Sequence, residues 1–199
     1  GGEVSDIKKV VSPVLIRDRN TAIYYIDFSF DNFQLGGSAF AQSLGKIGKT
    51  APTVKDSEYF ASAFNTIQEL IEKDLILAGH DISAGGMITA LLEMNFGNPE
   101  GGLEINLDKI AEKDIIKILF SENPGVLIQV KDKNSVEKIL QNNGIGFSKI
   151  GRPCKERHIL VKKDNAEYQF GIDYLRDVWF SSSYLLDRKQ SGEKAAAAR

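Results

Sequence analysis

Residues that suit a metal-bound phosphate follow one another between His80 and Gly86. Asp81 offers a carboxylate and Ser83 a hydroxyl, while the following Gly85 has no Cβ to hold a phosphate away from the main chain. A carboxylate aimed at a phosphate is repelled unless a cation lies between them, so Asp81 is a candidate Mg²⁺ ligand. Ser83 is a candidate nucleotide-binding residue, because its hydroxyl can bond to a phosphate oxygen.

Two elements must position this turn. The apolar run from Leu75 to Ala78 predicts a buried strand before it, and a helical pattern follows it as far as Met94. The first N–H groups of a helix lack intrahelical partners, and the helix dipole leaves partial positive charge there, so the turn suits an anion. A purely structural alternative stays open, in which Asp81 and Ser83 cap the helix and the glycines form a hinge.

A second turn has the same chemistry. Gly36 and Gly37 stand before Ser38 and a short helical stretch, and the two turns could face one ligand. Glu122 lies between a helix predicted over 113–120 and a strand predicted over 126–130. Its carboxylate suits either a turn hydrogen bond or a ligand contact, and the sequence leaves both open.

The composition indicates a globular protein and excludes several functions. The 199 residues, 42% of them hydrophobic, suffice for a core. Lys+Arg 25 against Asp+Glu 27 gives a net charge of -2 with no long basic block, which argues against nucleic acid or a membrane as a partner. We expect no membrane-spanning run and no leader. Cys154 is the only cysteine, so an internal disulfide and a Cys-based zinc site are excluded and a reducing cytoplasm is expected.

The expected elements run as strands, helices and strands again. Segments 10–16 and 22–29 predict a hairpin, in which Asp27 is either a feature of a bent edge, which we favour, or a site residue. A strongly periodic helix follows Asp56, and a last helix from Ile172 to about Arg188 is expected to bury a set of apolar side chains: Leu175, Val178, Trp179, Leu185 and Leu186.

No βαβ unit repeats, which favours an α+β fold, an α/β sandwich in which helices pack on one face of a mixed sheet. We expect a single domain over residues 1–190. Residues 191–199 are a low-complexity tail, left open as native or added.

Several stretches together resemble one family. They are LGGSAFAQSLG (35–45), GHDISAGGMITALLEM (79–94), GGLEINL (101–107), LFSENPGVLIQV (119–130) and the closing VWFSSSYLLDRKQ. In this order they resemble the C-terminal half of the domain pair in the aminoimidazole ribonucleotide synthetase superfamily. Within that superfamily they are most similar to the large, single-chain phosphoribosylformylglycinamidine synthases, in the second such half. The resemblance implies the fold of that C-terminal domain.

The resemblance also implies an activity and ligands. The family is a ligase that uses ATP and glutamine to convert formylglycinamide ribonucleotide to formylglycinamidine ribonucleotide in purine synthesis. It implies Mg²⁺ and ATP or ADP as cofactors. The family's turn, His-Asp-x-Ser-x-Gly-Gly, places its Mg²⁺-ligand aspartate at Asp81 and its nucleotide-contacting serine at Ser83. His80 matches without a chemical role, and Ala84 stands where relatives are often acidic.

Other parts of such an enzyme are implied as partners. These are the N-terminal synthetase half, with its lysine and acidic metal ligands, and a glutaminase domain with a cysteine nucleophile. We therefore expect the chain to form one wall of a Mg-nucleotide site, productive or auxiliary, with no catalytic residue of its own and no activity alone. Alternatives are another ATP-dependent synthetase or kinase of the superfamily, or a non-catalytic structural domain.

Overall fold

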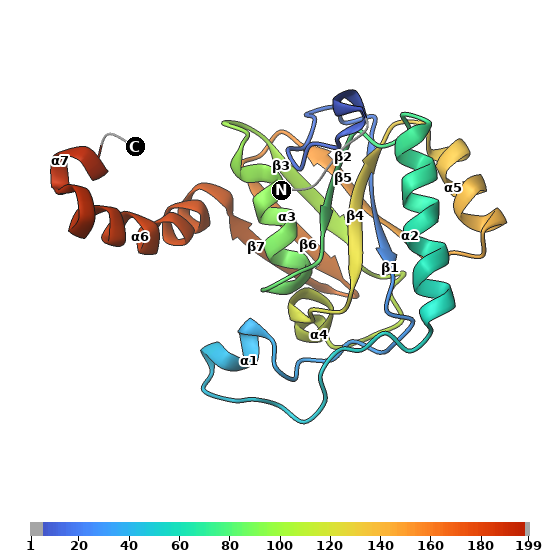
Figure 1. Ribbon diagram of the computed structural model, residues 1–199, viewed down its shortest axis with the longest axis horizontal. Helices are drawn as coiled ribbons and strands as arrows, with labels where there is room; N and C mark the ends of the chain where they lie inside the picture. The colour runs from blue at the N-terminus through green and yellow to red at the C-terminus, as the bar shows by residue number, and fades with distance from the viewer. Residues whose placement is uncertain (1–5, 198–199) are drawn as a thin grey trace.

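A seven-stranded sheet forms the body of the computed structural model, which describes residues 6–197 (Figure 1). The strand order is β2-β4-β1-β5-β3-β6-β7. All neighbours are antiparallel except β3 and β6, which are parallel, so the sheet is mixed as expected. The strands are β1 Ala22–Asp27, β2 Ala78–Asp81, β3 Gly102–Asn106, β4 Gly125–Val130, β5 Phe147–Cys154, β6 His158–Lys163 and β7 Ala166–Gly171.

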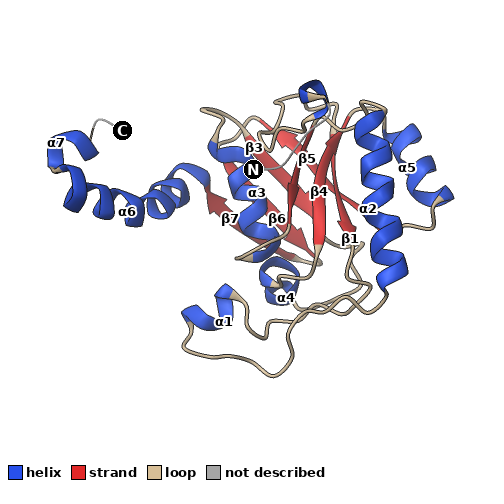
Figure 2. Cartoon of the chain, viewed as in Figure 1, coloured by secondary structure: helices blue, strands red, loops and turns tan. Residues whose placement is uncertain are grey.

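The helices lie around this sheet (Figure 2). Asp56 begins the longest helix of the body, because its carboxylate accepts the backbone N–H groups of Glu58 and Tyr59, each at 3.0 Å. The helices are η1 Ile7–Lys9, α1 Ala39–Ser43, α2 Ser57–Glu72, α3 Gly86–Phe96, α4 Ile115–Phe120, α5 Lys133–Asn142, α6 Ile172–Ser191 and α7 Glu193–Ala196.

Helices cover both faces of the sheet rather than the single face expected. In β1, Ile23 and Tyr25 pack into a core with α3 and α4, whereas Tyr24 and Ile26 pack into a second core with α2 and α5. Alternate residues of a strand point to opposite faces, so a strand that is apolar at every position needs cover on both. The α+β class is confirmed, and the apolar residues of the inner strands explain the additional layer.

The N-terminal hairpin prediction is wrong. Segment 10–16 forms no strand, because its backbone bonds elsewhere: the Gln129 side chain binds the N–H and C=O of Ile16 at 2.8 and 2.6 Å. β1 pairs with β4 and β5 and is an inner strand. Asp27 therefore marks no edge, and its carboxylate forms a turn by accepting the N–H groups of Ser29 and Phe30, both at 3.0 Å.

Helix α6 extends away from the sheet (Figure 1). Leu175 is partly buried against the first core, but beyond it no sheet lies beneath the helix, and Trp179 contacts only the rings of Phe96 and Phe180 among aromatic residues described. The prediction of burial is thus wrong for the rest of the set, which is about half exposed: Val178, Trp179, Leu185 and Leu186. Over residues 6–197, no helix combines the length and apolar character that crossing a membrane requires.

The predicted tail begins inside this helix. Residues up to 197 are described, and Gly192, with φ of +81°, separates α6 from α7. Residues 1–5 and 198–199, which belong to the predicted domain and tail, lie outside the described residues.

Because the two cores lie on opposite faces, we predict that they lose stability independently. Leu70 and Leu91 are each fully buried, one in each core. Replacing either with alanine should lower the free energy of unfolding by about 2–5 kcal/mol, and the double variant should lose the sum within about 0.5 kcal/mol. Urea denaturation measures all three, with the exposed Lys138→Ala as control. A large coupling energy would contradict two separate cores.

Candidate functional site at the end of strand β2

Strand β2 extends further toward the glycine turn than its apolar run indicates. Asp81 pairs with Val126 of β4, so His80 and Asp81 end an edge strand, and only residues 82–85 form the turn. The strand predicted over 75–78 is therefore shifted. Backbone pairing with β4 determines where β2 ends, and apolar character does not report that partner.

The Asp81 carboxylate is open to solvent. Its side chain is 73% exposed, and its oxygen lies 3.5 Å from Nδ1 of His80. It accepts no backbone N–H within the described residues, and the exposed Ser83 caps nothing, because the N-cap of α3 is Gly85 without any side-chain bond. The helix-capping alternative is thus excluded for both side chains, which remain available to a ligand.

The two glycines serve the turn itself. Gly85 and Gly86 adopt φ of +88° and +74°, which side-chain-bearing residues rarely adopt. A Cβ on Gly86 would also lie 2.7 Å from the carbonyl oxygen of Leu119, so α4 could not approach the start of α3. Backbone conformation and packing therefore require these glycines whether or not a phosphate approaches.

Glu122 joins the two glycine turns. Its Oε1 accepts the backbone N–H of Gly85 at 2.9 Å and that of Ala39 at 2.7 Å. The two turns do converge, and the group they share is a carboxylate of the chain itself. Negative charge is favourable at the starts of both helices, α3 and α1, for the same reason that an anion would be. Of the two alternatives for Glu122, the structure contains the turn hydrogen bond.

Two buried neighbours of Glu122 fasten the loop that carries the second turn. Ser121 Oγ accepts the N–H of Gln34 at 3.1 Å and donates to its carbonyl at 2.8 Å. Asn123 Nδ2 donates to Ser29 Oγ and to the Asn32 carbonyl, at 3.0 and 3.1 Å. Sequence reasoning missed both residues, although two polar residues at the junction of an apolar helix and an apolar strand were a usable signal.

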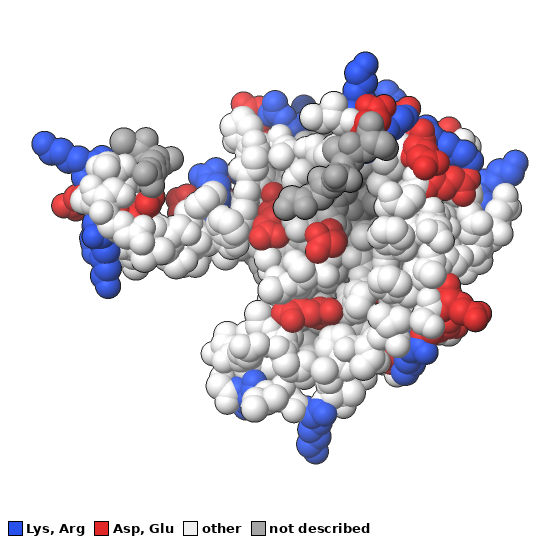
Figure 3. Space-filling model, in the orientation of Figure 1, with Lys and Arg blue, Asp and Glu red and all other residues white. Residues whose placement is uncertain are grey.

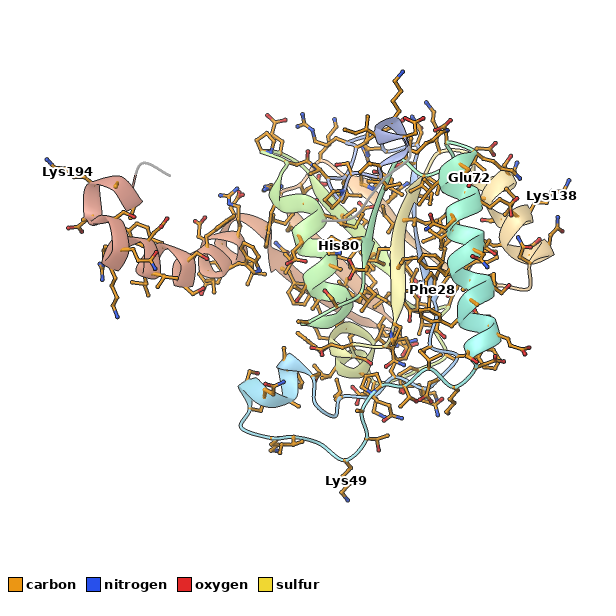
Figure 4. The ribbon with its side chains drawn as sticks, in the orientation of Figure 1. Phe28, Lys49, Glu72, His80, Lys138 and Lys194 are labelled. Carbon is orange, nitrogen blue, oxygen red and sulfur yellow. The ribbon has the colours of Figure 1, made fainter. Side chains whose placement is uncertain are left out.

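His80 holds the end of β2 against α3 (Figure 4). Its Nε2 lies 3.2 Å from a carboxylate oxygen of Glu93, and its Nδ1 lies 2.8 Å from the carbonyl oxygen of Asp81. Both ring nitrogens are thus engaged by the chain. This arrangement gives His80 a positioning role at the backbone of Asp81.

An apolar groove of about 370 Å³ runs beside the edge strand. Its walls come from α2, β4 and the N-terminal segment, with His80 and Asp81 at β2. The charged side chains in the middle of the face shown in Figure 3 are acidic. They repel a phosphate that approaches this face unless a cation lies between the phosphate and the carboxylates. The lining residues are Val11, Pro13, Ile67, Ile71, Ile76, Gly79, His80, Asp81, Val126, Leu127 and Ile128.

The donor set fits a shared magnesium site. Over residues 6–197, no three His, Cys, Asp or Glu side chains converge as a complete metal site. Mg²⁺ is commonly held by one or two carboxylates together with phosphate oxygens and water. Asp81 fits one such ligand position, with the others supplied from outside this chain.

The single thiol is not arranged for nucleophilic attack. Cys154 is buried at the end of β5, and burial, followed by the nearby negative charge of Glu156, raises the pKa of the thiol. The thiolate is the reactive form, so burial and the raised pKa both disfavour reaction of this cysteine.

The fold and the turn define a class of synthetase-related domain. Residues 31–163 match the model of "AIR synthase related protein, C-terminal domain", and the chain belongs to that family. Among curated relatives, it is 33% identical over 190 residues to the "Probable phosphoribosylformylglycinamidine synthase, chloroplastic/mitochondrial" of Arabidopsis thaliana, covering 93% of this chain and 13% of that protein. It is 29% identical over 199 residues to the "Phosphoribosylformylglycinamidine synthase" of Homo sapiens, covering 96% and 15%. The chain thus spans a small part of these relatives.

Solved structures share the fold. The structure of "T. maritima PurL complexed with ATP" matches with a TM-score of 0.65 and 15% identity, covering 85% of this chain and 28% of that one. "T. maritima PurL complexed with FGAR" matches with the same TM-score and 18% identity, covering 85% and 30%.

We predict that Glu122→Ala releases both glycine turns at once. The amides of Gly85 and Ala39 lose a charged acceptor, which should cost about 1–2 kcal/mol of stability and accelerate hydrogen exchange at both. Glu122→Gln should have a smaller effect, because its amide oxygen can still accept. Exchange measured by NMR checks this, and acceleration at only one amide would contradict the bridge.

We predict that Cys154 reacts slowly with a thiol reagent in the native protein at pH 8, at least about tenfold slower than in urea. Because its pKa is raised in the folded state, the contribution of Cys154 to stability is present below the ordinary thiol range and is lost as pH rises through it. Reaction with Ellman's reagent measures the rate. Equal rates in both states would show that the thiol is accessible.

Proposed function

We propose that the chain is the C-terminal half of a synthetase domain pair within a phosphoribosylformylglycinamidine synthase. Residues 1–190 would form this one domain. The parent enzyme would act as a C–N ligase in purine synthesis, converting formylglycinamide ribonucleotide to formylglycinamidine ribonucleotide with ATP and with ammonia from glutamine. Family membership and the names of the curated relatives support this proposal.

In this proposal the chain supplies one wall of a Mg-nucleotide site. Asp81 is a ligand of Mg²⁺, and Ser83 contacts the nucleotide. The metal, when bound, neutralises phosphate charge beside the acidic face. The observation that carries the proposal is the exposed Asp81 carboxylate, which ends an edge strand beside an apolar groove and is not engaged in capping α3.

The remaining machinery belongs to other domains of the parent chain. An N-terminal synthetase half would supply further metal and substrate ligands, and a glutaminase domain would supply the cysteine nucleophile that the buried Cys154 cannot provide. The isolated chain then binds nucleotide weakly and turns nothing over. A lone reduced cysteine suits the cytoplasm, although the plant relative's name places that protein in organelles.

Two observations favour a second candidate function, a structural domain without ligand. Glu122 already occupies the N–H of Gly85, and Ala84 provides no second carboxylate in the turn. In that case the convergence of the two turns serves the fold alone. The Mg²⁺ dependence of ATP binding separates the two candidates.

We predict that Mg-ATP binds the chain and raises its Tm, and that Asp81→Ala weakens the metal-dependent part of binding by about tenfold or more, because the metal loses its protein ligand. Ser83→Ala should weaken nucleotide binding less, by a few fold, since one neutral hydrogen bond is lost. Calorimetry with and without Mg²⁺ measures both.

Asp177→Asn, at an exposed position of α6, is the matched control and should bind as wild type. ATP, ammonia and formylglycinamide ribonucleotide together should release no ADP. The structural candidate is the correct one if Mg²⁺ changes neither the affinity for ATP nor the Tm. This must hold both for the wild-type chain and for a version extended by the preceding domain.

A further inference from the structure

A groove of about 690 Å³ lies over the half of the sheet beyond α5, whose first residue, Lys133, lies at the margin of the groove. Helices α2 and α5 pack on the same side of the sheet, but over β1 and β4. The groove lies over β5, β3 and β6, and six Lys or Arg side chains face only two carboxylates in it. Its lining is Arg19, Thr21, Glu104, Ile105, Asn106, Asp108, Lys109, Lys133, Lys149, Ile150, Gly151, Arg152, Leu160 and Lys162.

A β-bulge brings two of these cations together. Lys149 and Arg152 both line the groove, although residues three apart on a regular strand point to opposite faces. The register of β5 against β1 shifts between Ile23 and Tyr24, and the extra residue, Ile150, is buried in the core of the opposite face. Bulges are common beside binding sites because they re-aim side chains. This irregularity therefore concentrates positive charge on one face.

Much of that charge is not neutralised. Arg152 and Lys162 have carboxylate partners, at 2.9 Å from Glu104 and 2.6 Å from Glu167. Three other lysines form no ion pair with any residue over 6–197: Lys109, Lys133 and Lys149. Since the whole chain carries a net charge of -2, the excess is local to the groove. An anionic ligand would meet three ammonium groups that form no ion pair, although two carboxylates, Glu104 and Asp108, also line the groove.

The residue types select the class of anion. No aromatic side chain lines the groove, so it lacks the stacking surface of single-stranded nucleic-acid sites. Protein interfaces are enriched in aromatic residues and depleted in lysine, whereas this groove has no aromatic lining residue and four lysines. Lysine binds phosphate as a point charge, and sites for small molecules span about 300–1,000 Å³. A small phosphorylated compound fits best.

We propose that this groove binds a small anion with two or more linked phosphates, such as a nucleoside triphosphate or inorganic polyphosphate, through Lys133 and Lys149. The site is separate from the Asp81 turn, because β4 and β1 lie between β2 and β5 in the sheet. It needs no divalent cation. It is therefore independent of the proposed function.

The test is calorimetry on the whole chain in EDTA at low salt, with NMR of the amides of residues 149–152. Tripolyphosphate and ATP should bind with similar affinity and shift these amides. AMP, with a single phosphate, should bind at least about tenfold more weakly. A nucleotide-specific site would instead bind ATP and not tripolyphosphate. Binding should weaken steeply with salt. The double variant Lys133→Ala/Lys149→Ala should lose about tenfold or more in affinity for both polyphosphates.

Lys138→Ala is the matched control, because Lys138 is an exposed lysine on the outer side of α5 (Figure 4) and lies outside the groove. It and Asp81→Ala should both bind as wild type, and circular dichroism confirms that each variant is folded. The proposal is overturned if the double variant binds normally, if Lys138→Ala loses as much, or if the shifted amides lie elsewhere. Binding of ATP without tripolyphosphate, or of an acidic peptide without either, also overturns it.

Discussion

The structure depends on the burial of strand β1 from both sides. Its residues alternate between two cores, and its two edges pair with β4 and β5. Both faces and both edges of β1 are therefore covered by other parts of the protein. Both helical layers, α3 with α4 and α2 with α5, are needed to exclude water from this strand. Beyond β5, strands β3 and β6 place few apolar residues on the face that α2 and α5 cover elsewhere. A charged groove can therefore form there without disturbing either core.

The candidate site follows from what this frame leaves at its margin. β2 is the last strand on one side, so its end is open to solvent, and the carboxylate of Asp81 lies there without a backbone N–H partner among the described residues. Glu122 draws the starts of α1 and α3 toward one carboxylate and thereby fixes the turn that follows Asp81. Rigidity comes from internal hydrogen bonds, while the groups suited to a ligand remain at the surface.

What the sequence could predict was local. The periodicity of α2 concerns residues within a few positions of one another, and this prediction was confirmed. The turn around Ser83 was likewise visible as a polar break. The role of Glu122 was not, because its partners Ala39 and Gly85 are 83 and 37 residues away. Trp179 was misjudged for a related reason, since helical spacing does not tell whether a sheet lies beneath the helix.

The position of β1 has a consequence for how the chain folds during synthesis. Ala22 pairs with Val130 and Ile26 pairs with Phe147, so the strand leaves the ribosome long before either partner exists. Until then an apolar, aromatic segment with two unpaired edges is exposed, and such segments are prone to aggregation. The sheet can close only once synthesis has passed β5. The sheet of this chain therefore forms only when the last third of the chain is synthesised. A chaperone that shields β1 would act mainly between the synthesis of β1 and that of β5.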